Sequence, residues 1–203
     1  MLDRWTLPLI KKPLHSGARV LARFNVSANQ VSVSGFMVGL MTIPLLAFQQ
    51  FELAMICILF NRISDGIDGE LARLTQPSDQ GAFLDIVLDF IFYSAVVFGF
   101  AMANPDQNAL VAAALIFAFI GTGTSFLAFS VIAERRQIKS VEYPNKGIYY
   151  MTGLAEGTET IVFFMFICLW PEHFVIAAWI FAAICYLTTA FRVWGGYRTL
   201  AVN

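Results

Sequence analysis

Hydrophobic residues along the chain form long runs that are separated by short polar segments. A helix that spans a membrane needs about 20 mostly apolar residues, and six segments approach that description: residues 31–48, 53–74, 81–103, 109–133, 147–170 and 173–194. The segment 53–74 is apolar in its first half and charged in its second, and the segment 81–103 shows the reverse order. This pattern predicts an all-α polytopic membrane protein with six transmembrane helices.

Basic residues sort to one side of these segments. The connections at 49–50, 104–108 and 171–172 contain no Lys or Arg, and all 13 basic residues fall toward the opposite ends of the expected helices. Basic residues mark the cytoplasmic side of a membrane protein. We therefore expect both termini of the chain to be cytoplasmic.

The first 25 residues follow a different pattern, in which apolar residues recur at near-helical spacing and are opposed by basic residues. Such a segment predicts an amphipathic helix in the cytoplasmic membrane interface, with its cations toward anionic headgroups; a solvated basic tail is the alternative. Pro8 and Pro13 predict that this helix is broken into two pieces. Because no internal repeat or second domain is evident, we expect one membrane domain over 1–203, with the interfacial helix at 1–25 and the bundle at about 31–198.

The composition indicates the same class of protein. Hydrophobic residues make up 58% of the chain and charged residues 13%, whereas soluble domains carry roughly 25% charged residues. A soluble fold of this size would therefore lack the polar residues that its surface needs, and we expect membrane lipids but no nucleic acid among its partners. The three cysteines lie in apolar segments and are expected to be packing residues: Cys57, Cys168 and Cys185.

Four aspartates stand out in the charged halves of the second and third expected helices. Asp65 and Asp68 are three residues apart and Asp85 and Asp89 four apart, so each pair lies on one face of its helix. The turn between the helices, residues 75–80, is short, so the helices must be antiparallel neighbours whose aspartate faces can meet. At about 1.5 Å of rise per residue, both pairs lie in the inner leaflet near the cytoplasmic edge.

Four carboxylates at close range inside a membrane are costly as bare anions. Either some of them are protonated or a cation enters the site. Ligation by oxygen alone, without His or Cys, suits a hard divalent ion such as Mg²⁺ or Mn²⁺, which commonly binds substrate phosphates. Small residues leave space beside the carboxylates for such a substrate, although small-residue helix packing is an alternative explanation for them: Gly66, Gly69, Ala72 and Gly81.

The arrangement Asp65-x2-Asp68-Gly69-x2-Ala72-Arg73-x7-Gly81-x3-Asp85-x3-Asp89 resembles the signature of the CDP-alcohol phosphotransferase family. The resemblance implies an enzyme of phospholipid synthesis that transfers a phosphatidyl-type group from a CDP-lipid, usually CDP-diacylglycerol, to an alcohol and releases CMP. It further implies a homodimer, and we expect a bacterial inner membrane with a cytoplasmic active site. The implied roles are metal binding by Asp65, Asp68, Asp85 and Asp89, general-base catalysis by Asp89, and nucleotide binding by Gly69, Ala72, Arg73 and Gly81.

The acceptor alcohol is left open by the sequence, with glycerol phosphate, inositol phosphate and serine among the possibilities. A phosphorylated acceptor needs basic residues near the metal, and Arg136, Lys146 and Arg192 are candidates, although anchoring at the cytoplasmic interface is an alternative for such residues. Glu156 and Glu159, one turn apart in the fifth segment, suit a cationic amino-alcohol or an ion. They equally suit salt bridges with Arg192, Arg62 or Arg136.

Three other functions use the same features. The metal site would also serve a hydrolase that takes water as the acceptor. A divalent-cation transporter is compatible with intramembrane carboxylates, but the outer halves of the second and third segments are purely apolar, and a conduction path should continue across them. A non-catalytic lipid-binding protein is the third alternative, against which the intact signature argues.

Overall fold

The computed structural model describes residues 3–138 and 153–201, which form helices and no β-strand. In chain order these are α1 (Asp3–Arg23), α2 (Ala28–Leu40), α3 (Thr42–Ala47), α4 (Phe51–Leu74), α5 (Asp79–Ala103), α6 (Pro105–Arg135), α7 (Gly157–Leu169), a short 3₁₀ turn (Pro171–His173) and α8 (Phe174–Ala201). The expected all-α class is confirmed.

Within the described residues, four helical stretches are long and apolar enough to span a membrane: Ala28–Ala47, Asp79–Ala103, Pro105–Arg135 and Pro171–Ala201. The expected count of six is therefore supported only for these four. The segment expected at 53–74 is the helix α4, but its second half carries the charges already noted. The segment expected at 147–170 forms a described helix only over Gly157–Leu169, which at 13 residues is shorter than the roughly 20 that a spanning helix needs.

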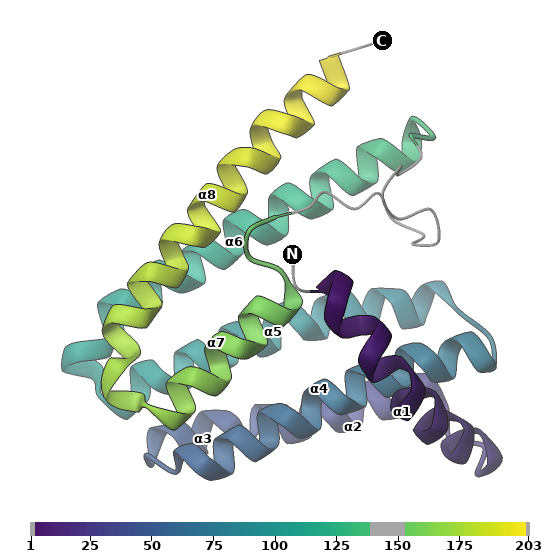
Figure 1. Ribbon diagram of the computed structural model, residues 1–203, viewed down its shortest axis with the longest axis horizontal. Helices are drawn as coiled ribbons and strands as arrows, with labels where there is room; N and C mark the ends of the chain where they lie inside the picture. Colours follow the sequence, from purple (N-terminus) through teal and green to yellow (C-terminus); the bar gives the residue numbers. More distant parts are fainter. Residues whose placement is uncertain (1–2, 139–152, 202–203) are drawn as a thin grey trace.

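The long helices pack as antiparallel neighbours (Figure 1). α6 lies along α8, α2 lies along α4, and α3 and α2 both contact α5. α7 packs against α4 on the side away from α2, and α1 crosses the end of α4 that carries the charged residues. α4 is therefore contacted by α1, α2, α3 and α7, of which α1 covers its charged end.

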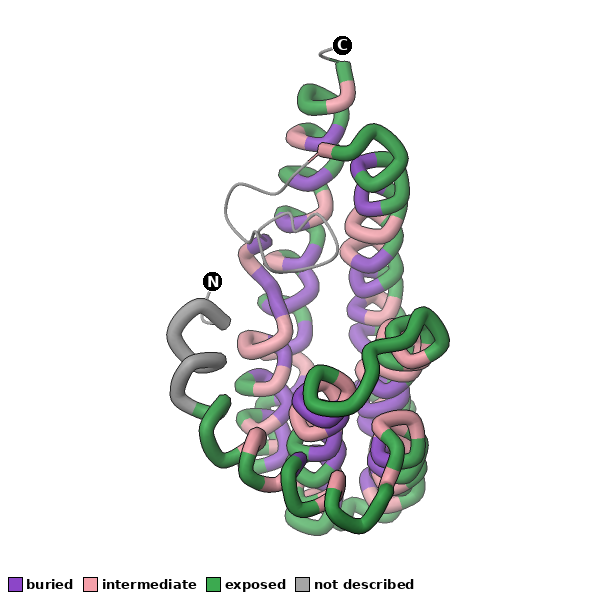
Figure 2. Tube along the Cα trace, turned by 90° about the vertical axis from the view of Figure 1, so that its right-hand side faces the viewer, coloured by how far each residue is buried: buried purple, intermediate pink, exposed green. Residues whose placement is uncertain are grey.

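Buried residues line the inward faces of the helices, whereas their outward faces are exposed (Figure 2). Phenylalanine rings join different helices in this core: Phe100 of α5 stacks on Phe174 of α8 at 4.7 Å between ring centroids, and Phe163 of α7 stacks on Phe181 of α8 at 4.5 Å. Cys168 and Cys185 are buried among these apolar residues, as expected for packing residues. Aromatic contacts thus connect α8 to the rest of the bundle.

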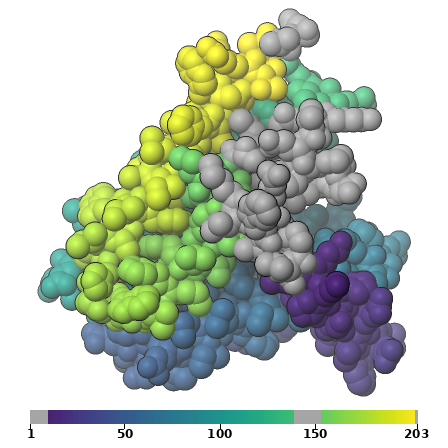
Figure 3. All heavy atoms as spheres, viewed as in Figure 1, coloured from purple at the N-terminus to yellow at the C-terminus, as the bar shows by residue number. Residues whose placement is uncertain are grey.

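The outer surface of the long helices is strongly apolar. Large side chains that a soluble protein would bury are more than half exposed, among them Leu110, Phe117, Ile176, Ile180 and Phe191. In Figure 3, α7 and α8 lie at the left and top of the molecule, and α1 lies at the lower right. Apolar residues exposed on this scale are typical of helices that face lipid, and with the four spans they make the chain an integral membrane protein.

The N-terminal segment forms one helix, α1, which continues through Pro8 and Pro13. The predicted break into two pieces is therefore wrong: each proline removes a single backbone hydrogen bond, and the helix continues on both sides. Ala18 of α1 is buried with Val31 and Leu71, so this half of α1 is packed on the bundle. A Cβ on Gly66 would lie 2.7 Å from Leu14 Cδ1, so Gly66 permits the close approach of α1 to α4.

Candidate active site

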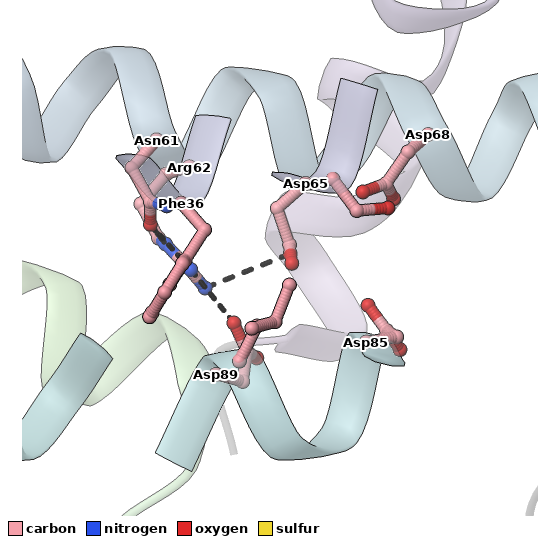
Figure 4. Close-up of a pocket in the computed structure, with 9 residues that line it drawn as sticks. Phe36, Asn61, Arg62, Asp65, Asp68, Asp85 and Asp89 are labelled. Carbon is pink, nitrogen blue, oxygen red and sulfur yellow. Dashed lines mark hydrogen bonds and ion pairs between the residues drawn. The ribbon is translucent and has the colours of Figure 1, made fainter. Parts of the chain in front are cut away.

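The turn between α4 and α5 brings the two aspartate pairs together. Ser78 caps the N-terminus of α5, where its hydroxyl accepts a hydrogen bond from the Gly81 backbone N–H at 3.1 Å. This cap satisfies an otherwise unpaired helix N–H and sets where α5 begins. Asp65 and Asp68 from α4 then point toward Asp85 and Asp89 from α5 (Figure 4).

Three of the four aspartates converge closely. Asp65, Asp68 and Asp85 each offer a carboxylate oxygen, and these atoms all lie within 4.8 Å of one another. The donor set consists of carboxylates without nitrogen or sulfur ligands, which fits a hard divalent cation such as Mg²⁺ or Mn²⁺. The structure thus brings together the aspartates that the sequence selected as candidate metal ligands, in a pocket whose wall also includes Ser32 and Phe36.

The fourth aspartate is bound by an arginine. Asp89 Oδ1 accepts a hydrogen bond from Arg62 Nη2 at 2.7 Å, and Arg62 Nη1 lies 3.6 Å from Asp65 Oδ2 (Figure 4). The Arg62 side chain is 13% exposed. Arg62 was expected only as a possible partner of the glutamates near 156, so its place among the aspartates was missed. Its spacing of three residues before Asp65 is the local signal that could have indicated this contact.

Neighbouring side chains hold the guanidinium of Arg62 in a fixed place. Asn61 Oδ1 accepts a hydrogen bond from Arg62 Nε at 2.9 Å, and Asn61 Nδ2 donates to the Gly35 carbonyl of α2 at 3.1 Å. Arg62 Nη1 also donates to the Tyr93 hydroxyl at 3.2 Å, and its Cζ lies 4.7 Å from the centre of the Phe92 ring. These polar and cation–π contacts orient the guanidinium toward the aspartates.

α2 supports this arrangement because it lies unusually close to α4. A Cβ on Gly39 would lie 2.9 Å from Asn61 Nδ2 and 2.9 Å from Phe92 Cδ2, and one on Gly35 would overlap the side chain of Ser64. Only glycine permits this close approach without displacing the helices. The contact from Asn61 to the Gly35 carbonyl depends on it.

The expected nucleotide-binding residues lie at the charged end of α4 and the start of α5. Arg73 is exposed, and its Nη2 donates to Glu70 Oε1 at 2.7 Å. A Cβ on Gly69 would lie 3.6 Å from Arg73 Nη2, so the guanidinium lies over Gly69. Ala72 is on the same helix, and Gly81 follows the Ser78 cap on α5.

Glu70 is a further polar residue that the sequence did not single out. Its side chain is only 8% exposed, and besides Arg73 it has His15 of α1 as a partner, with Nδ1 3.2 Å from Oε2. Glu70 therefore links α1 to the arginine beside the site. Its position between Gly69 and Arg73 of the signature, two residues after Asp68, gave no indication of this link.

Two of the expected acceptor residues, Arg136 and Arg192, donate to backbone carbonyls. Arg136 donates to the Leu200 carbonyl at 2.7 Å and so ties the end of α6 to the end of α8. Lys146 lies outside the described residues. Arg192 is buried in α8, where Nη1 donates to the Thr122 carbonyl of α6 at 3.0 Å.

Glu156 and Glu159 bind backbone groups at the start of α7. Glu156 Oε1 accepts from the Gly153 N–H at 3.0 Å, and Glu159 Oε2 accepts from the Glu156 N–H at 3.2 Å, which makes a capping box. Such a box satisfies the unpaired N–H groups at a helix start. The capping contacts supply a structural role for two glutamates that were expected as ligands of an amino-alcohol or as salt-bridge partners.

The sequence model of the family described as CDP-alcohol phosphatidyltransferase matches residues 25–194. The chain belongs to this family. The resemblance drawn from the signature is therefore confirmed, and with it the membership of a family of phosphatidyl-group transferases. The match includes the four aspartates and all four candidate nucleotide-binding residues.

Two relatives show how far the similarity extends. The inner membrane protein YnjF of Escherichia coli K12 is 50% identical over 200 residues, which cover 98% of this chain and 97% of that protein. Archaetidylinositol phosphate synthase of Pyrococcus horikoshii is 32% identical over 98 residues, which cover 48% of this chain and 52% of that one. The first similarity therefore extends over nearly the whole chain, and the second over about half of it.

Solved structures share the fold. Phosphatidylinositol phosphate synthase (PgsA1) of Mycobacterium tuberculosis with CDP-DAG bound has a TM-score of 0.72 at 18% identity, covering 91% of this chain and 93% of that one. The same protein in complex with manganese and citrate has a TM-score of 0.68 at 20% identity, covering 91% and 88%. At this identity the likeness concerns the fold.

Proposed function

We propose that this protein transfers a phosphatidyl group from a CDP-activated lipid to a small alcohol and releases CMP. The observation that carries the proposal is the convergence of Asp65, Asp68 and Asp85 beside Asp89, on the two helices that bear the family signature. The donor is CDP-diacylglycerol or a similar CDP-lipid. The structural neighbour with CDP-DAG bound supports this donor.

Asp65, Asp68 and Asp85 would hold Mg²⁺ or Mn²⁺, and the neighbour crystallised with manganese supports an ion of this kind. A bound ion would neutralise the negative charge of the pyrophosphate and the charge that builds on the leaving CMP. Arg73 is exposed beside Gly69, where its guanidinium can bind a phosphate oxygen of the nucleotide. Gly69, Ala72 and Gly81 leave space for the cytidine.

Asp89 would be the general base. Its carboxylate takes the proton of the acceptor hydroxyl, whose oxygen attacks the β-phosphorus that carries the lipid. The bond from that phosphorus to the bridging oxygen breaks, and CMP leaves with this oxygen. Arg62 binds Oδ1 of Asp89 at 2.7 Å, and we assign Oδ2 to the acceptor hydroxyl.

The site lies beside Arg62 and Arg73, in the half of α4 that carries its basic residues, and the positive-inside rule supports a cytoplasmic location for it. A water-soluble alcohol can reach such a site while the lipid donor stays in the bilayer. The similarity to a bacterial inner membrane protein supports a bacterial inner membrane as the location. The homodimer implied by the family resemblance stays a prediction.

The test uses purified protein in detergent with CDP-diacylglycerol, Mg²⁺ or Mn²⁺, and a panel of alcohols that includes glycerol phosphate, inositol phosphate and serine. We expect one alcohol to drive metal-dependent CMP release and to appear in a new phospholipid. CMP release without any alcohol would show a hydrolase instead, and CDP-lipid binding without CMP release would contradict an enzymatic function.

One variant tests the site in this assay, and a second variant is its matched control. Asp85→Asn should abolish CMP release because it removes one carboxylate of the converging triad. Asp106→Asn, an exposed aspartate in the first turn of α6, should retain full activity. Equal activity of the two variants would contradict the proposed site.

A further inference from the structure

α1 crosses α4 at close range, and a glycine from each helix permits the approach. A Cβ on Gly66 of α4 would lie 2.7 Å from Leu14 Cδ1, and a Cβ on Gly17 of α1 would lie 3.3 Å from Ile67 Cδ1. Ala18, the next residue of α1, is fully buried. α1 is therefore fixed against α4 within about one helical turn of Glu70.

The carboxylate of Glu70 joins the two helices, because each of its oxygens has a different partner. Oε1 accepts a hydrogen bond from Arg73 Nη2 at 2.7 Å on α4, and Oε2 lies 3.2 Å from His15 Nδ1 on α1. An ionised carboxylate can only accept hydrogen bonds, so we assign the donated proton to Nδ1 of His15. The Glu70 side chain is 8% exposed, and a buried charge is costly without such partners.

Arg73 is the mobile member of this group, since its side chain is 65% exposed. A long exposed side chain loses rotamer freedom when it binds a ligand. The bond to Glu70 restricts the guanidinium to the side of α4 that carries Gly69, whose Cβ position is 3.6 Å from Nη2. A guanidinium has five N–H groups in a fixed fork, so an arginine held through Nη2 can still donate to a phosphate. Restraint before binding increases affinity because less freedom is lost on binding.

We propose, resting on the proposed function, that Glu70 and His15 are positioning residues for the CDP-lipid. His15 of α1 orients the Glu70 carboxylate, and Glu70 holds Arg73 over Gly69, where the arginine binds a phosphate oxygen of the donor. α1 then acts on donor binding through Glu70. Because the reacting groups are unchanged, loss of either residue should raise the KM for the CDP-lipid and leave kcat nearly constant.

The experiment compares two substitutions of His15 in the CMP-release assay with CDP-diacylglycerol and the active alcohol. His15→Phe keeps a ring but cannot donate, so the KM for the CDP-lipid should rise by about 3- to 5-fold. His15→Asn keeps a side-chain N–H that can reach Glu70, so it should restore most of the wild-type KM. An equal rise in KM in the two variants would overturn the proposed role of His15, and His15→Leu replaces His15→Phe if the latter does not fold.

A double-mutant cycle tests whether His15 acts through Glu70. In Glu70→Gln protein, the further change His15→Phe should alter the KM by less than about 1.5-fold, because residues that act in one network are not additive. The control is Arg19→Gln, at an exposed position on α1 one turn after His15, which should leave the KM unchanged. A full effect of His15→Phe in Glu70→Gln protein, or an equal rise in KM in Arg19→Gln, would overturn the proposal.

Binding of CDP separates this inference from the transfer reaction. Isothermal titration calorimetry of the purified protein in detergent with CDP and Mg²⁺ should show binding about 3- to 5-fold weaker in His15→Phe than in the wild type. Weaker CDP binding in His15→Phe without CMP release under any condition would overturn the transferase and leave the roles of His15 and Glu70 in place. Alcohol-dependent CMP release with unchanged CDP affinity in His15→Phe would overturn these roles and leave the transferase intact.

Discussion

Arg62 and Arg192 are arginines in the apolar part of the same bundle, and their surroundings differ. Arg62 binds the side chains of Asp89, Asp65 and Asn61, which line the same pocket. Arg192 binds the backbone carbonyl of Thr122 and lies with its Cζ 5.6 Å from the ring of Phe126. Both arginines occupy places where an uncompensated charge would be costly.

The groups around each arginine show what its charge is used for. Near Arg192, the Thr188 hydroxyl accepts the N–H groups of Leu154 and Ala155, and Glu156 accepts that of Gly153. A Cβ on Gly153 would lie 3.1 Å from Arg192 Nη2, so these contacts adjoin the arginine and hold the segment before α7 against α8. These contacts of Arg192, Thr188 and Glu156 are made to backbone groups, whereas Arg62 binds carboxylates that the proposed reaction needs.

Removing the carboxylate of Asp89 should have the largest effect and would sharpen the comparison most. Asp89→Asn keeps the shape of the side chain but removes the proposed base, so kcat for CMP release should fall by about 10²- to 10⁴-fold. Steady-state kinetics with CDP-diacylglycerol and the active alcohol measure this. Asp79→Asn, at an exposed position in the first turn of α5, is the control, and a loss below 10-fold in Asp89→Asn would remove Asp89 from the role of base.

Replacing each arginine by methionine compares the two regions directly. Arg62→Met should lower kcat by about 10²-fold, because Asp89 loses its orienting partner, with a smaller change in KM. Arg192→Met should instead destabilise the protein by about 1–3 kcal/mol, because it removes the hydrogen bond by which this buried arginine joins α8 to the Thr122 carbonyl of α6. Kinetics and thermal unfolding in detergent separate the two effects. A rise of more than 10-fold in the acceptor KM of Arg192→Met, at unchanged unfolding temperature, would make Arg192 an acceptor residue after all.

Gly39→Ala tests whether close helix packing supports the Arg62 region. The new Cβ would meet Asn61 Nδ2 and Phe92 Cδ2 at 2.9 Å, and overpacking of this kind costs about 1–3 kcal/mol. We expect a lower unfolding temperature and reduced CMP release, because Asn61 holds Arg62. Gly17→Ala, whose Cβ would meet only the end of the Ile67 side chain at 3.3 Å, should be tolerated; equal behaviour of the two variants would argue against this support.

The smallest expected effect concerns Glu70, which lies outside both arginine clusters. Glu70→Gln should raise the KM for the CDP-lipid by about 3- to 10-fold, because the neutral amide binds the Arg73 guanidinium less strongly, and should leave kcat nearly unchanged. The control is Glu52→Gln, at an exposed position in the first turn of α4. An unchanged KM would show that Arg73 is positioned without Glu70.

Much of this organisation could be predicted from local patterns along the chain. Long apolar runs predicted the helical membrane class, and spacings of three and four residues placed the aspartates on facing sides of adjacent helices, because a helix repeats every 3.6 residues. The short turn at 75–80 made α4 and α5 neighbours. The family signature identified the transferase family. These predictions depend on contacts between residues close in sequence, or joined by a short turn.

Other features depend on contacts between distant helices, and only the tertiary structure decided them. The partners of Arg62 include Asp89 and Tyr93 of α5, and Asn61 is anchored on α2. The segment before α7 is held against α8 because the Thr188 hydroxyl accepts the N–H groups of Leu154 and Ala155. A charged residue in an apolar helix must find a partner, and the sequence by itself determined that need. Which partner it found was decided by the packing of the helices, since several acidic and basic residues lay within reach.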